Sequence, residues 1–414
     1  MTDTNNALCR FCRAPLRHTF VDLGMSPLCQ TQIHPSQLNR MEPFFPLHVH
    51  VCEACLLVQL EEYVTPDVIF GAEYPYYSSY SDSWVRHAQD YVEHVMQEHG
   101  IGGRSFVVEL ASNDGYLLQH FVKRGVRCLG IEPSEGVSVA ARARDVPTLT
   151  RFFGSRTAAE VRAAEGPADL ILGNNVLAHV PDVNDFLAGV KSLLADGGMV
   201  TFEFPHLMRL IEHNQFDTIY HEHFSYFSFT TVRRILAAHG LRVFDVRELP
   251  THGGSLRVYA CHDSDAARPE HARVAQLQTR EAAEGQADLA MYDRFGRQVE
   301  ETKRNLLRFL IEARQAGKKI VGYGAPGKGN TLLNYCGIRT DFLEYTVDRN
   351  PHKQGTYTPG TRIPIHDPSR IMQTRPDYVL ILPWNLSTEI MRSMHGIREW
   401  GGQFVVPIPS VQVL

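Results

Sequence analysis

The sequence predicts an α/β protein in which a small cysteine-rich domain precedes two domains built on parallel sheets. Two pairs of cysteines lie near the N-terminus. A strand, a tight turn, a helix and a second strand follow one another over residues 106–133, and the same succession recurs from residue 318. We therefore place three domains, at residues 1–72, 73–263 and 264–414.

Composition restricts the class of protein. The 414 residues suffice for two or three domains, and 43% hydrophobic with 21% charged residues is ordinary for a soluble globular protein. A net charge of -5 gives no indication of the basic surface that nucleic-acid binding requires. We see no apolar run of membrane-spanning length and no signal peptide. We expect a cytoplasmic protein with no nucleic-acid or membrane partner, whose thiols stay reduced.

Four of the eight cysteines form two C-x-x-C pairs, Cys9 with Cys12 and Cys52 with Cys55. In a reducing compartment such pairs indicate a metal before a disulfide. Two knuckles supply four thiolates for tetrahedral zinc and leave no open coordination position. We predict a structural zinc ion that stabilises a segment too small for a large core. A redox dithiol and unliganded core cysteines are the alternatives.

A tyrosine- and serine-rich stretch, EYPYYSSYSDSW, covers residues 73–84. It is either a packed aromatic connector or a loop over a polar ligand, because tyrosine offers both a flat face and a hydroxyl. Tyr76 and Tyr77 are the candidate ligand contacts. A helix over residues 84–96 then leads into the central strand.

The central stretch, Phe106 to Pro133, opens the second domain. Residues 106–108 read as a buried parallel strand that Glu109 closes. After a turn of small and polar residues, apolar residues recur at helical spacing over 117–122. A second strand over 128–131 ends at Glu132, which completes the opening unit of a doubly wound nucleotide-binding fold.

The turn of this unit discriminates among nucleotides. A dinucleotide site needs three glycines there, and only Gly115 is present. Glu109 and Asp114 would repel a phosphate, whereas Glu132 suits a ribose diol. S-adenosylmethionine (SAM) carries an amino group, a sulfonium and a ribose but no phosphate, so the turn favours a SAM methyltransferase. The alternative is a turn that binds nothing.

Further polar residues follow the next strands of this domain. The strand over residues 169–173 ends at two asparagines, where ligands lie in this fold, and His179 follows them. Phe153 follows a short strand and packs either on adenine or in the core. Strands over 199–204, 241–249 and 255–261 close the sheet. The predicted SAM-binding residues are Glu109, Ser112, Asn113, Asp114, Gly115, Glu132, Pro133, Ser134, Phe153, Asn174 and Asn175.

The segment QFDTIYHEHFSYFS, residues 215–228, concentrates groups capable of acid–base chemistry. A histidine such as His223 is a suitable base near neutral pH. Glu222 could orient a base or hold a substrate hydroxyl, and Tyr220 could donate to a developing oxyanion. The alternative is a surface loop with polar side chains.

The C-terminal third begins with charged, alanine-rich helices over residues 266–317. Then Gly322, Gly324 and Gly327 match G-x-G-x-x-G, and Asp348 follows the next strand as a ribose-binding acid would. This pattern predicts a Rossmann-like domain. Such a domain kept only for packing is the alternative.

The same glycine-rich loop nearly forms a P-loop, but Gly329 replaces the Ser or Thr that binds magnesium. Lys328, in a glycine-rich turn before a helix, still suits a diphosphate. One domain therefore favours SAM and the other a phosphorylated nucleotide, which suggests a nucleotide-linked substrate.

Together the motifs resemble those of the sugar C-methyltransferases that act on nucleotide-linked keto-sugars in deoxysugar pathways. The resemblance spans essentially the whole chain. In order, it is carried by the double C-x-x-C, EYPYYSS, ELASNDG, GNNVLAHV, YHEHFSYFS, HGGSLRVY and GYGAPGKG. It implies a zinc-binding N-terminal domain, a central class I SAM methyltransferase domain, and a C-terminal Rossmann-like domain that helps to hold the sugar nucleotide.

The resemblance also implies roles for individual residues. His223 would be the general base, Tyr220 and Glu222 would hold the sugar or its enolate, and His179 and Tyr76 would line the same pocket. The expected substrate contacts are Tyr77, His252, Gly324, Lys328 and Asp348. This chain departs from the common pattern at Ala111, where methyltransferases often have glycine, and at Gly329, where relatives can carry serine.

The activity we predict is deprotonation of a TDP-linked 4-keto-deoxysugar beside the ketone, at C-3, followed by methylation of the enolate with SAM. C-5 methylation and another nucleotide stay open. The alternatives from other classes are an NAD-dependent nucleotide-sugar oxidoreductase or epimerase, and a non-catalytic scaffold that binds zinc and a nucleotide.

Overall fold

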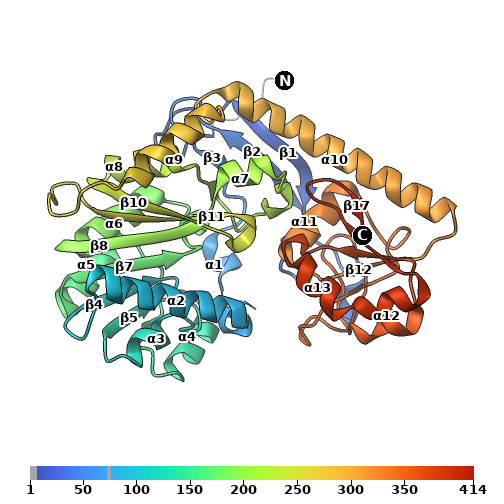
Figure 1. Ribbon diagram of the computed structural model, residues 1–414, viewed down its shortest axis with the longest axis horizontal. Coiled ribbons are helices and arrows are strands. Elements are labelled where there is room, and N and C mark those ends of the chain that lie inside the picture. The colour runs from blue at the N-terminus through green and yellow to red at the C-terminus, as the bar shows by residue number, and fades with distance from the viewer. Residues whose placement is uncertain (1–6, 72–75) are drawn as a thin grey trace. The chain divides into compact units, whose positions relative to one another are not determined.

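The computed structural model describes residues 7–71 and 76–414 (Figure 1). Residues 72–75, which hold the predicted boundary between the first two domains and the start of the tyrosine-rich stretch, lie outside the described residues. The chain forms two compact units, each built from several stretches. Unit 1 comprises Met1–Arg17, Cys52–Leu207 and Glu222–Ala287, and unit 2 comprises His18–Val51, Met208–His221 and Asp288–Leu414.

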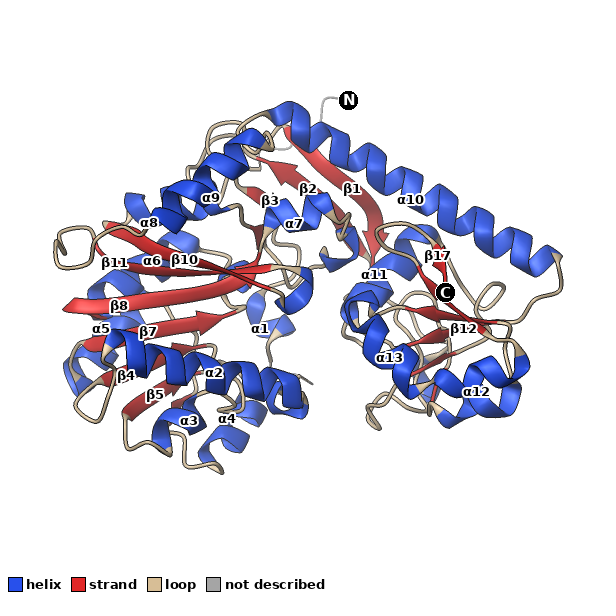
Figure 2. Cartoon of the chain, viewed as in Figure 1, coloured by secondary structure: helices blue, strands red, loops and turns tan. Residues whose placement is uncertain are grey.

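Unit 1 contains a seven-stranded sheet in the order β10-β11-β8-β7-β4-β5-β6 (Figures 1 and 2). Neighbours from β8 to β6 pair in parallel, and β11 is antiparallel to both of its partners. The strands are β4 Phe106–Leu110, β5 Arg127–Ile131, β6 Thr148–Leu149, β7 Ala168–Asn174, β8 Leu194–Pro205, β10 Leu241–Leu249 and β11 Ser255–His262.

The strand order reverses on either side of β4, which is the first of these strands along the chain. The chain runs from β4 outward to β5 and β6, and then returns to add β7 and β8 on the other side. In sheets of this kind ligands bind at the carboxyl ends of the strands where the order reverses. This order, closed by an antiparallel strand, is the predicted class I methyltransferase fold.

Helices cover both faces of this sheet, and alternate residues of each strand enter different cores. Phe106 and Val108 of β4 belong to one apolar cluster, and Val107 belongs to the other. The helices of unit 1 are α1 Pro66–Ile69, α2 Asp82–His99, α3 Leu118–Val122, α4 Glu135–Arg142, α5 Ser155–Glu165, α6 Val183–Leu193, α8 Phe229–Ala238 and α9 Ala272–Ala283. A separate antiparallel pair joins β3 Val58–Leu60 to β9 Ser225–Tyr226.

Unit 2 contains a six-stranded sheet in the order β14-β13-β12-β15-β16-β17. Its pairs are parallel except at β17, so the glycine-rich loop follows the first strand of a Rossmann-like sheet. Its strands are β12 Ile320–Tyr323, β13 Thr346–Val347, β14 Ile365–His366, β15 Tyr378–Ile381, β16 Gln403–Val406 and β17 Gln412–Val413. Its helices are α10 Leu289–Gln315, α11 Gly327–Cys336, α12 Ser369–Thr374 and α13 Ser387–Ser393.

Unit 2 also holds a long antiparallel pair of strands, β1 His18–Ser26 and β2 Phe45–Val51. Helix α7, Leu207–Glu212, lies where the chain passes from unit 1 to unit 2. Short 3-10 helices lie at Pro35–Gln37, Ser78–Tyr80, Leu177–His179, Phe216–Thr218, Thr251–Gly253, Trp384–Leu386 and His395–Trp400. Among the helices that the structure describes, none is long and apolar enough to span a membrane.

A buried carboxylate ties α9 to the start of α8. Glu281 accepts hydrogen bonds from the backbone N–H groups of Phe229 (2.6 Å) and Thr230 (2.7 Å) and from His206 Nε2 (2.7 Å). A negative charge here satisfies N–H groups that lack helical partners and interacts favourably with the helix dipole. Burial alone would raise the pKa of Glu281, but the bonds from His206 and Thr230 lower it overall.

We expect Glu281→Gln to lower the free energy of unfolding by about 1–3 kcal/mol at pH 7, because an amide cannot accept all of these bonds. The lowered pKa of the folded state means that the carboxylate contributes fully above about pH 5 and loses its contribution as the pH falls through that pKa. Urea unfolding at several pH values should therefore show the two proteins converging in acid. The exposed Glu284→Gln is the control, and a gap that persisted at low pH would contradict this account.

Candidate active site and metal centre

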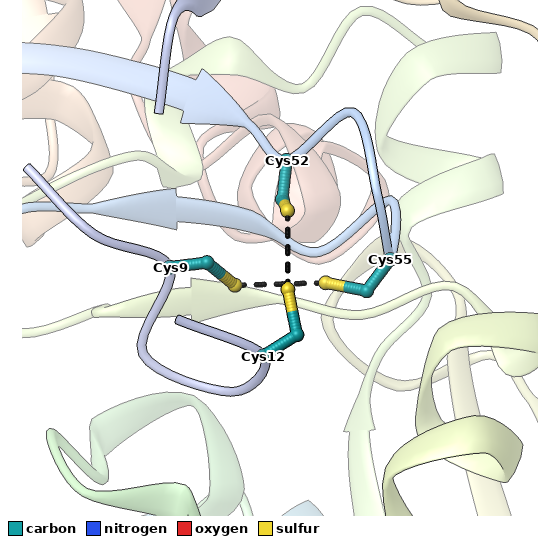
Figure 3. A group of neighbouring side chains, drawn as sticks. All are labelled: Cys9, Cys12, Cys52 and Cys55. Carbon is teal, nitrogen blue, oxygen red and sulfur yellow. Dashed lines mark hydrogen bonds between the residues drawn. The ribbon is translucent and has the colours of Figure 1, made fainter. Parts of the chain in front are cut away.

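The four paired cysteines converge from two turns of the chain, as Figure 3 shows. All four Sγ atoms lie within 4.8 Å of one another, and the Cys9–Cys55 and Cys12–Cys52 sulfur distances are both 3.5 Å. Tetrahedral zinc with Zn–S bonds of about 2.3 Å places its sulfurs roughly 3.8 Å apart. The donors therefore fit zinc, and four thiolates leave no position for a substrate.

Residues around the cluster orient its first knuckle. Gln59 Nε2 donates to Cys9 Sγ over 3.2 Å, and Gln59 Oε1 accepts from the Arg10 N–H over 2.9 Å. Asn184 Nδ2 donates to the carbonyls of Arg10 (3.1 Å) and Phe11 (3.0 Å). Groups that contact the ligands in this way fix the geometry of a metal site.

The turn after β4 has a strained backbone. Ala111 and Asn113 have positive φ angles of 54° and 50°, and Gly115 has 76°. The left-handed conformation costs free energy in residues other than glycine and persists where the surroundings impose it. Ala111 thus adopts the conformation for which glycine would be usual, so this departure from the common pattern leaves the turn intact.

Hydrogen bonds hold the turn from two sides. The Asn113 N–H donates to Glu132 Oε2 over 2.9 Å, and the Ser134 N–H donates to Glu132 Oε1 over 2.9 Å. The Asn113 side chain accepts from the Ser78 N–H (2.9 Å) and donates to the Tyr76 carbonyl (3.1 Å). The tyrosine-rich stretch and the turn after β4 therefore form one structure. Burial raises the pKa of Glu132 to about 7.

Glu109 lies buried beneath this turn. Neither of its carboxyl oxygens has a hydrogen-bond partner within residues 7–71 and 76–414. Burial, followed by the charges of Glu132 and Asp114, raises its pKa well above the ordinary value. An unpaired buried carboxyl group is costly, so the site suits a ligand with an amino group or another positive charge. Asp114, by contrast, pairs with Arg144 (3.1 Å).

Other predicted cofactor contacts differ in their surroundings. Asn174, at the end of β7, donates to the Tyr116 hydroxyl over 3.4 Å, and its Oδ1 atom has no partner among the described residues. Asn175 Nδ2 lies 3.0 Å from His252 Nε2, and both residues have a φ of 55°. Phe153 packs edge-on against Phe186 at the rim of the core. Pro133 and Ser134 precede α4, and Ser134 is its N-cap residue.

A buried ionic network at the end of β8 was missed by the sequence analysis. Glu203 forms a salt bridge with Arg257 and bonds to His87 Nε2 (2.8 Å) and Thr251 Oγ1 (2.9 Å). Burial alone would raise the pKa of Glu203, but the charge of Arg257 lowers it to about 2. The sequence feature that could have predicted this network is the acidic residue Glu203 inside the apolar run VTFEFP.

Aromatic rings gather between this network and the turn after β4. Trp84 stacks on Tyr116, with ring centroids 6.0 Å apart, and lies edge-on to His252 at 5.1 Å. On the tyrosine-rich stretch, Tyr77 stacks on Tyr80. Trp84 and Tyr116 were not among the predicted contacts, because each reads in the sequence as an ordinary residue of a helix or turn.

Three of the five predicted catalytic residues come together in unit 1. His179 Nδ1 donates to the Glu222 carbonyl over 2.8 Å, and the rings of His179 and His223 meet edge-on with centroids 4.7 Å apart. Burial lowers the pKa of His179 to about 4, so its ring is neutral. Of the other two, Tyr76 contacts the turn after β4 through its carbonyl. Tyr220 belongs to unit 2.

In unit 2, Lys328 at the glycine-rich loop and Asp217 of the 3-10 helix Phe216–Thr218 both contact Trp384. Lys328 Nζ donates to Asn385 Oδ1 over 2.9 Å and lies 4.7 Å from the centre of the Trp384 ring. Asp217 is buried and accepts from Trp384 Nε1 over 2.8 Å, while its Oδ1 atom has no partner in the described chain. Burial raises the pKa of Asp217 to about 7.

Two other predicted residues, Asp348 after β13 and Gly324 of the glycine-rich loop, shape this loop. Asp348 accepts hydrogen bonds from the N–H groups of Ala325 and Asn350, both over 2.8 Å. Gly324 has a φ of 89°, and a Cβ atom there would lie 2.5 Å from Pro383.

The sheet order and the acid-rich turn, with its single glycine, are those of a class I methyltransferase. Consecutive family models match the chain: a putative zinc-binding domain over residues 9–70, a methyltransferase domain over 62–246 and a C-methyltransferase C-terminal domain over 250–409. C-methyltransferase NovU of Streptomyces niveus is 36% identical over 408 residues, which cover 98% of this chain and 96% of NovU. The chain belongs to this family of C-methyltransferases.

Two solved structures are similar over part of the chain. They are magnesium protoporphyrin IX methyltransferase of Synechocystis PCC 6803 (15% identity, TM-score 0.34, 43% of this chain and 79% of that one) and the CcbJ methyltransferase of Streptomyces caelestis (12%, 0.34, 44% and 90%). The family models and NovU identify the class of enzyme. These, with the cysteine cluster, confirm the two predicted cofactors, SAM and structural zinc.

We expect Cys52→Ser to lower the thermal unfolding midpoint by about 5 °C or more, because one zinc ligand is lost. The dissociation constant for SAM should change less than about threefold, since the cluster lies outside the turn after β4. Differential scanning calorimetry, zinc analysis and SAM titration measure the three quantities. Cys261→Ser, at a buried cysteine outside the cluster, should keep its zinc. A folded, zinc-free protein that had lost SAM binding would contradict a purely stabilising metal.

We expect Gly130→Ala to weaken SAM binding by about tenfold. A Cβ atom at Gly130 would lie 2.3 Å from Ser112 Oγ and 2.9 Å from Ser112 Cβ, so the turn after β4 would have to move. Isothermal titration with SAM measures the effect. Gly102→Ala is the matched control, because nothing lies within 4 Å of its added Cβ. Equal SAM affinity in the two variants would show that the turn tolerates the shift.

Proposed function

We propose that this C-methyltransferase acts on a nucleotide-linked 4-keto-deoxysugar, removing a proton beside the ketone and methylating the enolate at C-3. The observation that carries the proposal is the edge-on pair of His179 and His223, with His179 bonded to the Glu222 carbonyl. The sugar substrate rests on the motifs shared with sugar C-methyltransferases, and C-5 methylation is the nearest variant of the reaction.

The pair supplies a base held in one orientation. His179 uses its Nδ1–H to bond the Glu222 carbonyl, which fixes its ring against that of His223. Its lowered pKa keeps it uncharged, so no neighbouring imidazolium opposes the protonation of His223. A carbon-bound proton beside a carbonyl is acidic enough for an imidazole to remove, and a positioned base contributes about 10²–10⁴-fold to the rate.

The remaining steps need a donor for the enolate oxygen and a methyl group. We assign the enolate to Glu222, protonated or acting through water, and a preorganised donor is worth a factor comparable to the base. Bound SAM supplies an electrophilic methyl group, which the enolate carbon takes as the carbon–sulfur bond breaks and S-adenosylhomocysteine forms. We assign Glu109, whose carboxyl group has no partner among the described residues, to the cationic part of SAM.

The nucleotide is assigned to unit 2. Lys328 is the second residue of α11, a ten-residue helix that follows the glycine-rich loop, and the N–H groups and the ammonium there suit a diphosphate. Gly324 and Asp348 shape the loop, and Tyr77 and His252 are assigned to the sugar. We also propose a cytoplasmic location, because a four-thiolate zinc site needs a compartment that keeps cysteines reduced.

We expect His223→Asn to abolish methyl transfer, with a loss of at least about 10²-fold, while SAM binds with unchanged affinity. The substrate is a TDP-4-keto-2,6-dideoxy sugar in deuterium oxide without SAM, and NMR monitors its C-3 position. Deuterium should enter at C-3 with the natural protein but not with the variant. Adding SAM should produce a new C-methyl signal only with the natural protein. His271→Asn, at an exposed histidine of unit 1, is the control. Normal exchange in His223→Asn would exclude His223 as the base.

A further inference from the structure

We propose that Arg10, inside the first zinc knuckle, is a positioning residue that connects the metal centre to the His179–His223 pair. The inference rests on the proposed function, because it concerns the residue assigned as the base there. It starts from the place of Arg10 in the chain: the residue lies between the zinc ligands Cys9 and Cys12, and its side chain points away from the cluster to other segments of unit 1.

The metal centre fixes the backbone of Arg10. Arg10 directly follows the zinc ligand Cys9. The Arg10 N–H donates to Gln59 Oε1 over 2.9 Å, and Gln59 Nε2 donates to Cys9 Sγ over 3.2 Å. The Arg10 carbonyl accepts from Asn184 Nδ2 over 3.1 Å. Zinc binding therefore determines where the Arg10 side chain starts.

The guanidinium group then contacts both segments that carry the histidine pair. Its Nη1 donates to the Pro181 carbonyl over 2.8 Å, two residues beyond His179. Its central carbon lies 5.4 Å from the centre of the Phe224 ring, and Phe224 follows His223 directly. Both contacts therefore fall within two residues of His179 or His223, the histidines whose rings form the proposed base pair.

The same segments are bonded to each other and to β3. The Phe224 N–H donates to the Ala178 carbonyl over 2.7 Å, and the Phe224 carbonyl accepts from the Leu60 N–H over 3.0 Å. Arg10 Nη2 donates to the Leu60 carbonyl. The guanidinium thus completes a closed set of contacts among the knuckle, β3, the His179 segment and the His223 segment.

The chemistry of these contacts indicates positioning and not charge pairing. Both hydrogen bonds of the Arg10 guanidinium go to backbone carbonyls, those of Pro181 and Leu60. A rigid fork of donors can bond two carbonyls at once and stack on a ring, whereas a lysine ammonium presents one flexible point charge. Arg10→Lys therefore keeps the charge and removes the fork.

The test uses full-length, zinc-loaded protein labelled with ¹⁵N in its histidine rings. At one fixed pH, long-range ¹H–¹⁵N spectra report the His223 ring, whose signals are assigned by their loss in His223→Asn. We expect Arg10→Lys to shift or broaden the His179 and His223 signals and to lower kcat by about ten- to a hundredfold. Zinc content, and KM and Kd for SAM, should stay within about twofold of the natural protein. Arg17→Lys, at an exposed arginine of the same N-terminal stretch, should leave every readout unchanged.

Unchanged histidine signals and an unchanged kcat in folded, zinc-loaded Arg10→Lys would overturn the proposal. If Arg10→Lys loses zinc, Phe224→Leu takes its place, because it removes the ring under the guanidinium and leaves the knuckle intact. Unchanged His223 signals in that variant would also overturn the proposal. The spectra need no sugar, so displaced signals support the role of Arg10 even if no keto-sugar is methylated, an outcome that would refute only the proposed substrate.

Discussion

The cofactor half of this protein depends on the two hydrogen bonds that the Glu132 carboxylate accepts from the backbone of Asn113 and Ser134. They join the turn after β4 to the residue before α4 and so fix the edge of the sheet where the strand order reverses. Asn113, held in a left-handed conformation, then bonds the tyrosine-rich stretch. This frame holds Glu109 buried, with no hydrogen-bond partner for its carboxyl group among the described residues, so the site suits a cationic ligand.

The zinc-binding domain also contacts the segment that carries His223. Its small sheet pair, β3 with β9, includes residues that directly follow His223 and Phe224, and Arg10 of its first knuckle contacts the same region. The rings of Phe224, Tyr226 and Phe227 in this segment are buried, which also holds it in place. Burial of these rings and the contacts with the zinc-binding domain together fix the segment that carries His223.

The glycine-rich loop shows how a sequence motif can have two causes. A Cβ atom at Gly322 would lie 2.6 Å from Thr346 Oγ1, and one at Gly329 would lie 2.9 Å from the Leu382 side chain. Close packing therefore accounts for these glycines without any ligand. Packing does not explain Lys328 beside Asn385 and Trp384. Nor does it explain Asp217 of the 3-10 helix Phe216–Thr218, whose Oδ1 atom has no partner among the described residues.

The sequence by itself determined the features that depend on local pattern. Apolar runs and helical spacing located the strands and helices around Phe106–Pro133, and the C-x-x-C spacing named all four members of the metal cluster. Only the tertiary structure brought together residues distant in the chain, such as Asn175 with His252 and Glu203 with Arg257. These pairs depend on strand order and register, which place β11 beside β8 with Arg257 opposite Glu203. Periodicity within one segment carries no information about which segment will lie next to it, because that choice is made by burial of the whole core.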